Sequence, residues 1–251
     1  MSGWAQFWAV DFHVHTPGSA DANEANFGTP EDIVAAAIAA GLDAIVVTDH
    51  NTSSWVDQVA SAAEGTSLTV IPGVEISTTE GHLLALWEVG TQSANINELL
   101  VRLGIGAADQ GKLDIAAEVG FAEAAKLIAE SGGIAIAAHV DKPKGLLSMP
   151  VKAHLKRTLL TDELSAVEVV HLDSRTDINN KIQGERPTTF VRGYDTDMAA
   201  LHANSLTGIG ARRTRSEPRN TATDRTHNAG ADQDVNEPVS GPRKISNPEG
   251  D

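Results

Sequence analysis

The 251-residue sequence contains no cysteine, and no lysine or arginine precedes Arg102. The lack of cysteine excludes disulfide bonds and thiolate metal ligands, and it fits a reducing cytoplasm. No apolar run reaches the length that spans a membrane. The start of the chain also lacks the basic segment and long apolar core of a signal peptide. We therefore expect a cytoplasmic protein that does not enter a membrane.

Basic residues are scarce overall, and the net charge is −15. Residues 211–251 hold seven basic and seven acidic side chains, so the whole excess lies in residues 1–210, with 12 basic and 27 acidic side chains. A surface of this kind repels long polyanions, so we do not expect binding to an extended nucleic acid duplex. Several bound divalent cations would partly offset the excess.

The composition changes at about residue 211. Residues 211–251 are rich in Asn, Asp, Thr, Pro, Gly and Arg, with few branched aliphatic residues and no aromatic residue. Such a segment cannot bury enough apolar surface to offset its ordering entropy. We predict one folded domain over residues 1–210 and a disordered tail over residues 211–251.

Within the first 210 residues, short apolar runs alternate with helix-like segments, which is typical of an α/β barrel or a doubly wound sheet. Thr29 is expected to cap a helix that has Pro30 in its first turn, and Gly41 to end it. Strands are expected at 7–12, 43–48, 68–73, 82–87, 134–139, 166–171 and 188–193, and helices at 29–41, 53–65, 95–104, 121–133 and 151–160.

Titratable residues gather where the predicted strands end. His13 and His15 are two positions apart on an extended segment, so their side chains share one face. The ends of the other strands bring Asp49 with His50, Glu75, His139, His171, and Asp195 with Asp197. In parallel α/β barrels this edge of the sheet carries the active site.

His82 begins a strand instead of ending one. Only six residues separate it from Glu75, and a parallel crossover needs about a dozen or more residues, whereas a hairpin needs few. We therefore expect this strand to return from the edge where the preceding strand ends, which brings His82 beside Glu75.

Imidazole and carboxylate ligands without thiolate suit zinc, manganese, iron or nickel. The ligands are too numerous for one tetrahedral ion and predict two or three divalent ions. A site with several metal ions can activate a bridging water and stabilise an in-line displacement at phosphorus. Hydrolysis of a phosphoester is therefore the expected reaction.

Four stretches, "DFHVHTPGSAD", "GLDAIVVTDHN", "PGVEIS…GHLLALW" and "GGIAIAAHVDKP", resemble in order and spacing the first four motifs of the PHP (polymerase and histidinol phosphatase) domain family. The resemblance covers roughly residues 9–210. It implies a distorted seven-stranded (β/α) barrel with a trinuclear centre of manganese, zinc or iron ions at its carboxyl edge.

The resemblance also implies roles for individual residues. His13 and His15 would bind one metal ion with Glu75, which would bridge to a second ion held by His82 and His139. Asp21 and His50 would hold a third ion. Asp49 would orient its neighbour, so that Asp49, His50 and Glu75 are the expected catalytic residues.

The last motif of the family, Asp-x-His after a strand, is altered here. Asp195 matches its aspartate, but Asp197 stands where histidine is expected, and His202 follows five residues later. Either Asp197 is a ligand, or His202 replaces it, or the third metal site is weakened.

The middle of the chain resembles most closely PHP domains at the N-terminus of larger predicted AAA-type ATPases. This resemblance implies a stand-alone or truncated version of such a protein, with a separate ATPase as a possible partner. No Gly-x-x-x-x-Gly-Lys-Ser/Thr phosphate loop occurs in the sequence.

We expect a hydrolase acting on a phosphodiester, in a nucleotide or at a nucleic acid end. Lys142, Lys144 and His171 are the expected substrate-binding residues. The basic group formed by Lys142, Lys144, Lys152, Lys156 and Arg157 is either a phosphate-binding rim or a solvated surface. The alternatives are a phosphatase of small phosphorylated molecules, a degenerate PHP domain that binds metal for a structural or regulatory role, and a barrel that binds no metal.

Overall fold

The computed structural model describes residues 8–22, 28–143, 145–148, 152–171, 173–182 and 190–192. The strands are β1 (Val10–Val14), β2 (Ala44–Val47), β3 (Thr69–Ser77), β4 (His82–Leu86), β5 (Ile134–Ala137), β6 (Leu164–Val169) and β7 (Phe190–Arg192). The helices are α2 (Pro30–Ala39), α3 (Val56–Ala62), α4 (Ser93–Arg102), α5 (Phe121–Glu130), α6 (Lys152–Leu159) and α7 (Ser174–Ile182), with a short 3-10 helix at Leu146–Ser148. The alternation of strands and helices confirms the α/β class.

The strands lie side by side in chain order from β1 to β7. Neighbouring strands are parallel except at β4, which runs antiparallel to both β3 and β5. The carboxyl ends of the other strands therefore share one edge of the sheet, and β4 begins at that edge. The predicted return of the chain at His82 is confirmed, because Ser77 pairs with His82 across the hairpin.

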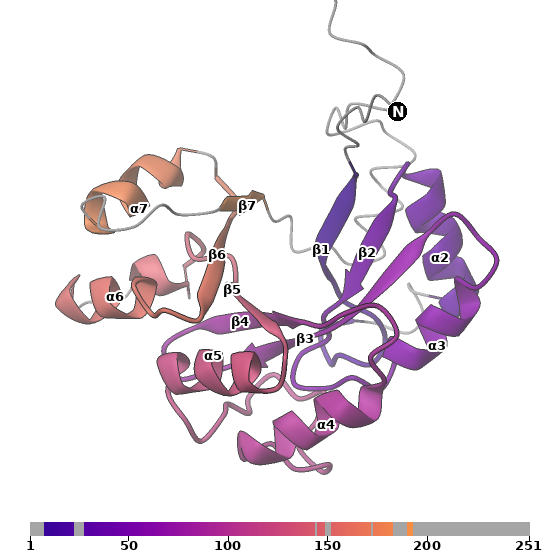
Figure 1. The fold of residues 1–251 in the computed structure, drawn as a ribbon, viewed down its shortest axis with the longest axis horizontal. Coiled ribbons are helices and arrows are strands. Elements are labelled where there is room, and N and C mark those ends of the chain that lie inside the picture. The colour runs from indigo at the N-terminus through magenta and orange to yellow at the C-terminus, as the bar shows by residue number, and fades with distance from the viewer. Residues whose placement is uncertain are drawn as a thin grey trace, which may run out of the picture. The chain divides into compact units, whose positions relative to one another are not determined.

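The sheet is curled into a half-barrel, with β1 to β6 forming its body and β7 continuing it beside β6 (Figure 1). The predicted closure into a barrel is not seen in the described part of the chain, where β1 and β7 are the two edge strands. The expected disordered tail over residues 211–251 lies outside the described residues.

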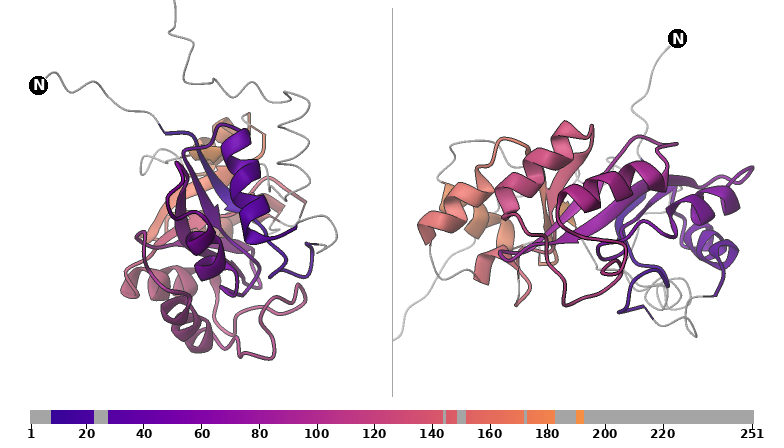
Figure 2. Two further views of the ribbon diagram at one scale, coloured as in Figure 1. Left: turned by 90° about the vertical axis from the view of Figure 1, so that its right-hand side faces the viewer. Right: turned by 90° about the horizontal axis from the view of Figure 1, so that it is seen from below.

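The two faces of the sheet are packed differently. Helices lie along the outside of the curl in all three views (Figures 1 and 2), and the larger apolar cluster fills the space between them and the sheet. A smaller cluster, which includes Val46, Leu84 and Ile136, lies on the inner face. Along β3 and β6 the polar side chains that face inward alternate with aliphatic residues of the larger cluster, as the pleat of a strand requires.

Local sequence signals explain the best-predicted helix. The Thr29 side chain accepts a hydrogen bond from the Asp32 backbone, and the Asp32 carboxylate accepts one from the Thr29 backbone, which completes a capping box before α2. Pro30 occupies the first turn, and Gly41 has a φ of +74° just beyond the helix. The predicted cap and stop are both confirmed.

A strand with a partner on each side explains the main difference from the predicted strand lengths. β3 pairs in parallel with β2 up to Pro72 and in antiparallel fashion with β4 from Gly73 onward. A Cβ atom at Gly73 would lie 2.7 Å from a Val46 methyl group and 2.9 Å from the Val47 carbonyl oxygen. Glycine at this close approach to β2 therefore lets one long strand reach the carboxyl edge and carry Glu75 there.

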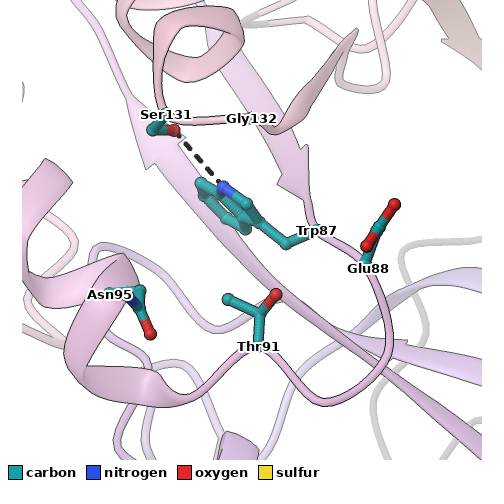
Figure 3. Close-up of a pocket in the computed structure, with 6 residues that line it drawn as sticks. All are labelled: Trp87, Glu88, Thr91, Asn95, Ser131 and Gly132. Carbon is teal, nitrogen blue, oxygen red and sulfur yellow. Dashed lines mark hydrogen bonds between the residues drawn. The ribbon is translucent and has the colours of Figure 1, made fainter.

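The hollow shown in Figure 3 lies at the opposite edge of the sheet, because Trp87 follows the last residue of the reversed strand β4. Trp87 donates a hydrogen bond from its indole nitrogen to the Ser131 hydroxyl at 3.3 Å. The hollow measures about 440 Å³ and is lined by Trp87, Glu88, Thr91, Asn95, Ser131 and Gly132. It is thus separate from the edge where the titratable residues gather.

Among the described residues, no helix has both the length and the apolar character needed to cross a membrane.

Candidate metal centre

Glu75 is the centre of the candidate site. It lies on β3 between Val74 and Ile76, which both pack into the larger apolar cluster. Because side chains alternate along a strand, Glu75 points to the inner face, where it is fully buried. Its Oε2 atom lies 2.9 Å from Nε2 of His13, 2.9 Å from Nε2 of His15 and 3.4 Å from Nε2 of His50, and its Oε1 atom lies 2.7 Å from Nδ1 of His82 and 3.0 Å from Nε2 of His139.

The five histidines come from parts of the chain that only the fold brings together. His13 lies in β1 and His15 directly after it, so the expected sharing of one face is observed, with their Nε2 atoms 2.9 Å apart. His50 follows β2, His82 begins β4 and His139 follows β5. The carboxyl edge predicted from the strand ends is thus the place where these side chains converge.

The convergent side chains form three groups whose possible ligand atoms lie within 4.8 Å of one another. The groups are His13 with Glu75 and His139, His15 with Asp21 and His50, and His50 with Glu75 and His82. Asp21 joins its group through a contact of 2.8 Å between its Oδ2 atom and Nδ1 of His15. Because Glu75 and His50 each belong to two groups, the three groups form one continuous cluster.

The atoms of this cluster fit divalent cations. Imidazole nitrogens and carboxylate oxygens of the cluster lie within hydrogen-bond distance of one another. A hydrogen bond places one proton between only two such atoms. The buried Nδ1 atom of His50 has no hydrogen-bond partner among the described residues, and neither has that of His139. A set of imidazole and carboxylate ligands suits zinc, manganese or iron.

Burial and charge act against each other in the cluster. Burial alone would lower the pKa of His13, but Glu75 and Glu168 raise it to about 10. Burial likewise opposes Asp21 and Glu75, which raise the pKa of His15 to about 9. Burial would raise the pKa of Glu75, but the histidines hold it well below its ordinary value. Bound metal ions would take the place of protons on these imidazoles, so metal affinity will depend on pH.

The pKa of His50 shifts in the opposite direction from those of His13 and His15. Burial of the His50 ring outweighs the nearby carboxylates and lowers its pKa to about 4. The ring is therefore neutral at pH 7 and retains a lone pair for a metal ion.

The backbone at His139 is strained. Its φ is 25°, in the left-handed region that residues other than glycine rarely adopt. The loop after β5 folds back tightly there: Lys142 donates its backbone N–H to the His139 carbonyl, and a Cβ atom at Gly145 would lie 2.5 Å from that carbonyl oxygen. Such conformations persist only where the surroundings hold them, and they cluster at functional sites.

The model of the PHP domain family matches residues 11–170 of the sequence. The chain belongs to the PHP domain family. No curated protein matches the sequence.

Solved structures share the fold of this PHP domain at low sequence identity. The lesion-specific endonuclease PfuEndoQ from Pyrococcus furiosus has a TM-score of 0.62 at 15% identity, over 77% of this chain and 49% of that chain. A putative metal-dependent phosphoesterase from Bifidobacterium adolescentis has a TM-score of 0.51 at 17% identity, over 75% and 87%. Endonuclease Q in complex with a 27-mer duplex that has an abasic lesion at the active site has a TM-score of 0.53 at 13% identity, over 76% and 49%. The match spans about half the length of the endonuclease Q chains.

Asp49 contacts the loop after β1 of the PHP domain and no ring of the cluster by a described hydrogen bond. Its oxygens accept hydrogen bonds of 2.5 Å from both the backbone N–H and the hydroxyl of Thr16. Burial raises its pKa to about 7. A Cβ atom at Gly18 would lie 2.8 Å from Asp49 Oδ2, so the loop that follows His15 is closely packed on this carboxyl group.

The predicted substrate-binding residues occupy different surroundings. Lys142 is half-buried, and its burial lowers its pKa despite the nearby charges of Glu168 and Glu75. His171 is exposed beyond the end of β6, where its backbone N–H donates to Asp141 Oδ2 at 2.7 Å. Lys144, Asp195, Asp197 and His202 lie outside the described residues.

Sequence reasoning missed Glu168. It lies fully buried on β6, and its carboxylate contacts the ring of His13 and the backbone of His139. The signal was present, because "AVEVV" places an acid between aliphatic residues of a strand in the same way that "GVEIS" places Glu75. An acid in that position faces away from the helices, toward the inner face.

Proposed function

We propose that this PHP domain is a metal-dependent phosphoesterase that hydrolyses a phosphodiester, in a nucleotide or at a nucleic acid end. The observation that carries the proposal is the convergence of five histidines on the buried carboxylate of Glu75. A single tetrahedral ion does not need so many ligands, whereas two or three ions do. Family membership supports the same reaction class.

The three groups built from His13, His15, Asp21, His50, Glu75, His82 and His139 would hold the divalent ions. Bound ions at this site would lower the pKa of a water molecule and stabilise charge on the phosphoryl oxygens. Glu75 joins two groups and keeps their nitrogens close together. Asp49 holds the loop after His15 through Thr16, which fixes the position of that ligand.

Substrate binding would involve the rim of the site. Lys142 is half-buried, and its ammonium group is near enough to Glu75 and Glu168 for their charges to act on it. It would therefore bind a phosphate oxygen at the edge of the metal centre. Lys144 and His171 remain proposed rim residues. Asp195 and Asp197 remain proposed ligands, with His202 as the alternative to Asp197.

The kind of substrate follows from charge and from the relatives. The acidic composition favours a small nucleotide or a strand end over an extended duplex. Endonuclease Q has been solved with a duplex substrate, so the PHP fold by itself does not exclude a duplex. The domain boundary at residue 210 and a separate ATPase partner remain predictions.

The test compares hydrolysis of bis(p-nitrophenyl) phosphate and p-nitrophenyl phosphate by purified protein with added Mn²⁺. The His13→Ala/His15→Ala variant should lose turnover while keeping the circular dichroism spectrum of the fold. Preference for the diester supports the proposal, and preference for the monoester indicates the alternative, a phosphatase of small molecules. Absence of turnover by folded, metal-loaded protein would favour the degenerate domain, the alternative that Asp197 suggests.

A second measurement tests the rim. Lys142→Met should raise KM for the diester more than it lowers kcat, because the lysine would bind phosphate without activating the water. Lys126→Met on the exposed side of α5 is the matched control, and it should leave both constants unchanged. An unchanged KM in Lys142→Met would remove this lysine from the substrate site.

A further inference from the structure

Glu168 makes an unusual pair of contacts with the candidate metal centre. Its side chain is fully buried, and both of its oxygens lie 3.1 Å from Nδ1 of His13. Its Oε2 atom also accepts a hydrogen bond from the backbone N–H of His139 at 2.6 Å. The two histidines are 126 positions apart in the sequence, and one carboxylate on β6 contacts both.

The contact with His13 determines which ring nitrogen is available to a metal ion. A carboxylate only accepts hydrogen bonds, so Nδ1 of His13 must carry the proton that faces Glu168. The lone pair of a neutral ring is then on Nε2, the atom that faces Glu75. Carboxylates that accept a hydrogen bond from the second nitrogen of a ligating histidine fix its ring orientation and raise its basicity.

The contact with His139 acts on the backbone. The φ of 25° at this residue is unfavourable, and the hydrogen bond from its N–H to Glu168 favours this conformation. The Nε2 atom of His139 lies 3.0 Å from Glu75 in this arrangement. Release of the backbone would let the peptide relax and move the ring away from its group.

Glu168 contacts one of the metal groups selectively. His13 and His139 are two of the three members of the group that Glu75 completes. None of the hydrogen bonds described for Glu168 reaches His15, Asp21 or His50, which form the separate group. A change at Glu168 should therefore affect one ion more than another.

We propose that Glu168 is a positioning residue for a single metal ion, the one held by His13, Glu75 and His139. It orients the first histidine through its ring and the second through its backbone. This role rests on the proposed function, because it requires that the cluster binds metal.

The test uses Mn²⁺ binding by the full chain, measured by isothermal titration and by elemental analysis after desalting. Glu168→Gln keeps the shape of the side chain but removes the charge and replaces one acceptor with an NH2 group. We expect the affinity of one class of site to fall about 10- to 100-fold, with the remaining class unchanged. The content of tightly held ion should fall by one equivalent.

Asp141→Asn is the matched control. Asp141 joins the same two segments, since it lies after β5 and accepts the backbone N–H groups of Val170 and His171 after β6. It touches no ring of the cluster by a described hydrogen bond. If Asp141→Asn keeps the wild-type number of bound ions while Glu168→Gln loses one, the loss is due to ligand positioning. A loosened contact between the segments after β5 and β6 would not explain it.

A spectroscopic measurement provides a readout that a merely structural role would not change. In zinc-loaded protein labelled with ¹⁵N-histidine, where the ion is diamagnetic, His13 should show a protonated Nδ1 with a downfield proton, and Glu168→Gln should shift or lose this signal. Glu168→Asp keeps the charge, so it should retain a higher metal content than Glu168→Gln. It replaces Glu168→Gln in the test if the glutamine variant fails to fold.

Two outcomes overturn the role of Glu168 in different ways. Full ion content and an unchanged His13 signal in folded Glu168→Gln would refute the positioning role while leaving the metal centre intact. Failure of the wild-type protein to bind Mn²⁺ would refute the proposed function together with this role.

Discussion

The substitution Glu75→Gln tests the centre of the site most directly. Glu75 is the only carboxylate in two of the three ligand groups, whereas the third group keeps Asp21. An ion that binds only the folded state stabilises it by about 2.7 kcal/mol when its free concentration is 100 times Kd. For a domain of this size each kcal/mol raises Tm by about 2–4 °C, so Mn²⁺ should raise the wild-type Tm by about 5–11 °C for one such ion.

Glutamine retains the volume of the side chain and loses its charge. If the affinity of a group that contains Glu75 falls about 100-fold, the same Mn²⁺ concentration equals its Kd, and the ion at that group stabilises the fold by only about 0.4 kcal/mol, or about 1–2 °C, while the group with Asp21 keeps its own contribution. Calorimetric scans with EDTA and then with Mn²⁺ give this difference for each protein against its own metal-free state. The cost of the substitution to metal-free stability therefore cancels.

The matched control is Glu64→Gln, which makes the same chemical change at an exposed residue after α3. It should show the full wild-type rise in Tm. The reasoning is refuted if Glu75→Gln, folded by circular dichroism, gains as many degrees from Mn²⁺ as the wild type does.

Three further predictions concern stability. Gly73→Ala should lower the free energy of unfolding in urea by about 1–3 kcal/mol, because its Cβ would lie 2.7 Å from a side-chain carbon on β2; a wild-type midpoint would contradict this. Thr29→Ala should lower it by about 1 kcal/mol through loss of the cap of α2, while Thr29→Ser should not. In EDTA, stability should fall as the pH rises from about 6.5 through about 9–10. Because the pKa values of His13 and His15 are raised in the folded state, protonation of these rings stabilises it fully below their ordinary value of 6.5 and no longer above the raised values. Urea midpoints at pH 7 and pH 10 check this, and a His13→Asn/His15→Asn variant with the same pH dependence as the wild type would disprove it.

The sequence predicted the parts of the site that follow from strand ends and from spacing. Two histidines at positions i and i+2 share a face in any extended segment, and His13 and His15 do so. The short interval between Glu75 and His82 allows only a hairpin, and the structure has that hairpin, with 2.7 Å between their side chains. Both signals are local, and this is why they can be read without the fold.

Other parts depend on tertiary packing and could not be predicted locally. Helix α7 has a mostly polar sequence with little apolar periodicity, and Ile178 is buried in the larger cluster. Pro72 and Gly73 indicate the end of a strand, yet β3 continues, because from Gly73 onward it pairs with β4 on one side while Glu75 still pairs with the segment after β2 on the other. The curl of the sheet likewise depends on the pairing of strands far apart in the sequence.

Glu168 shows how a pattern gains meaning once the topology is known. Both it and Glu75 are acids set between aliphatic residues on strands whose other face packs against helices. The pleat therefore points both acids inward, near the carboxyl edge, where an isolated charge would be costly to bury. Each is instead paired with histidine: Glu75 faces Nε2 of His13, and Glu168 faces Nδ1 of the same ring. With one nitrogen held by a carboxylate from β6, the ring can present its other nitrogen to a metal ion in only one direction, which is what a ligand in a crowded cluster requires.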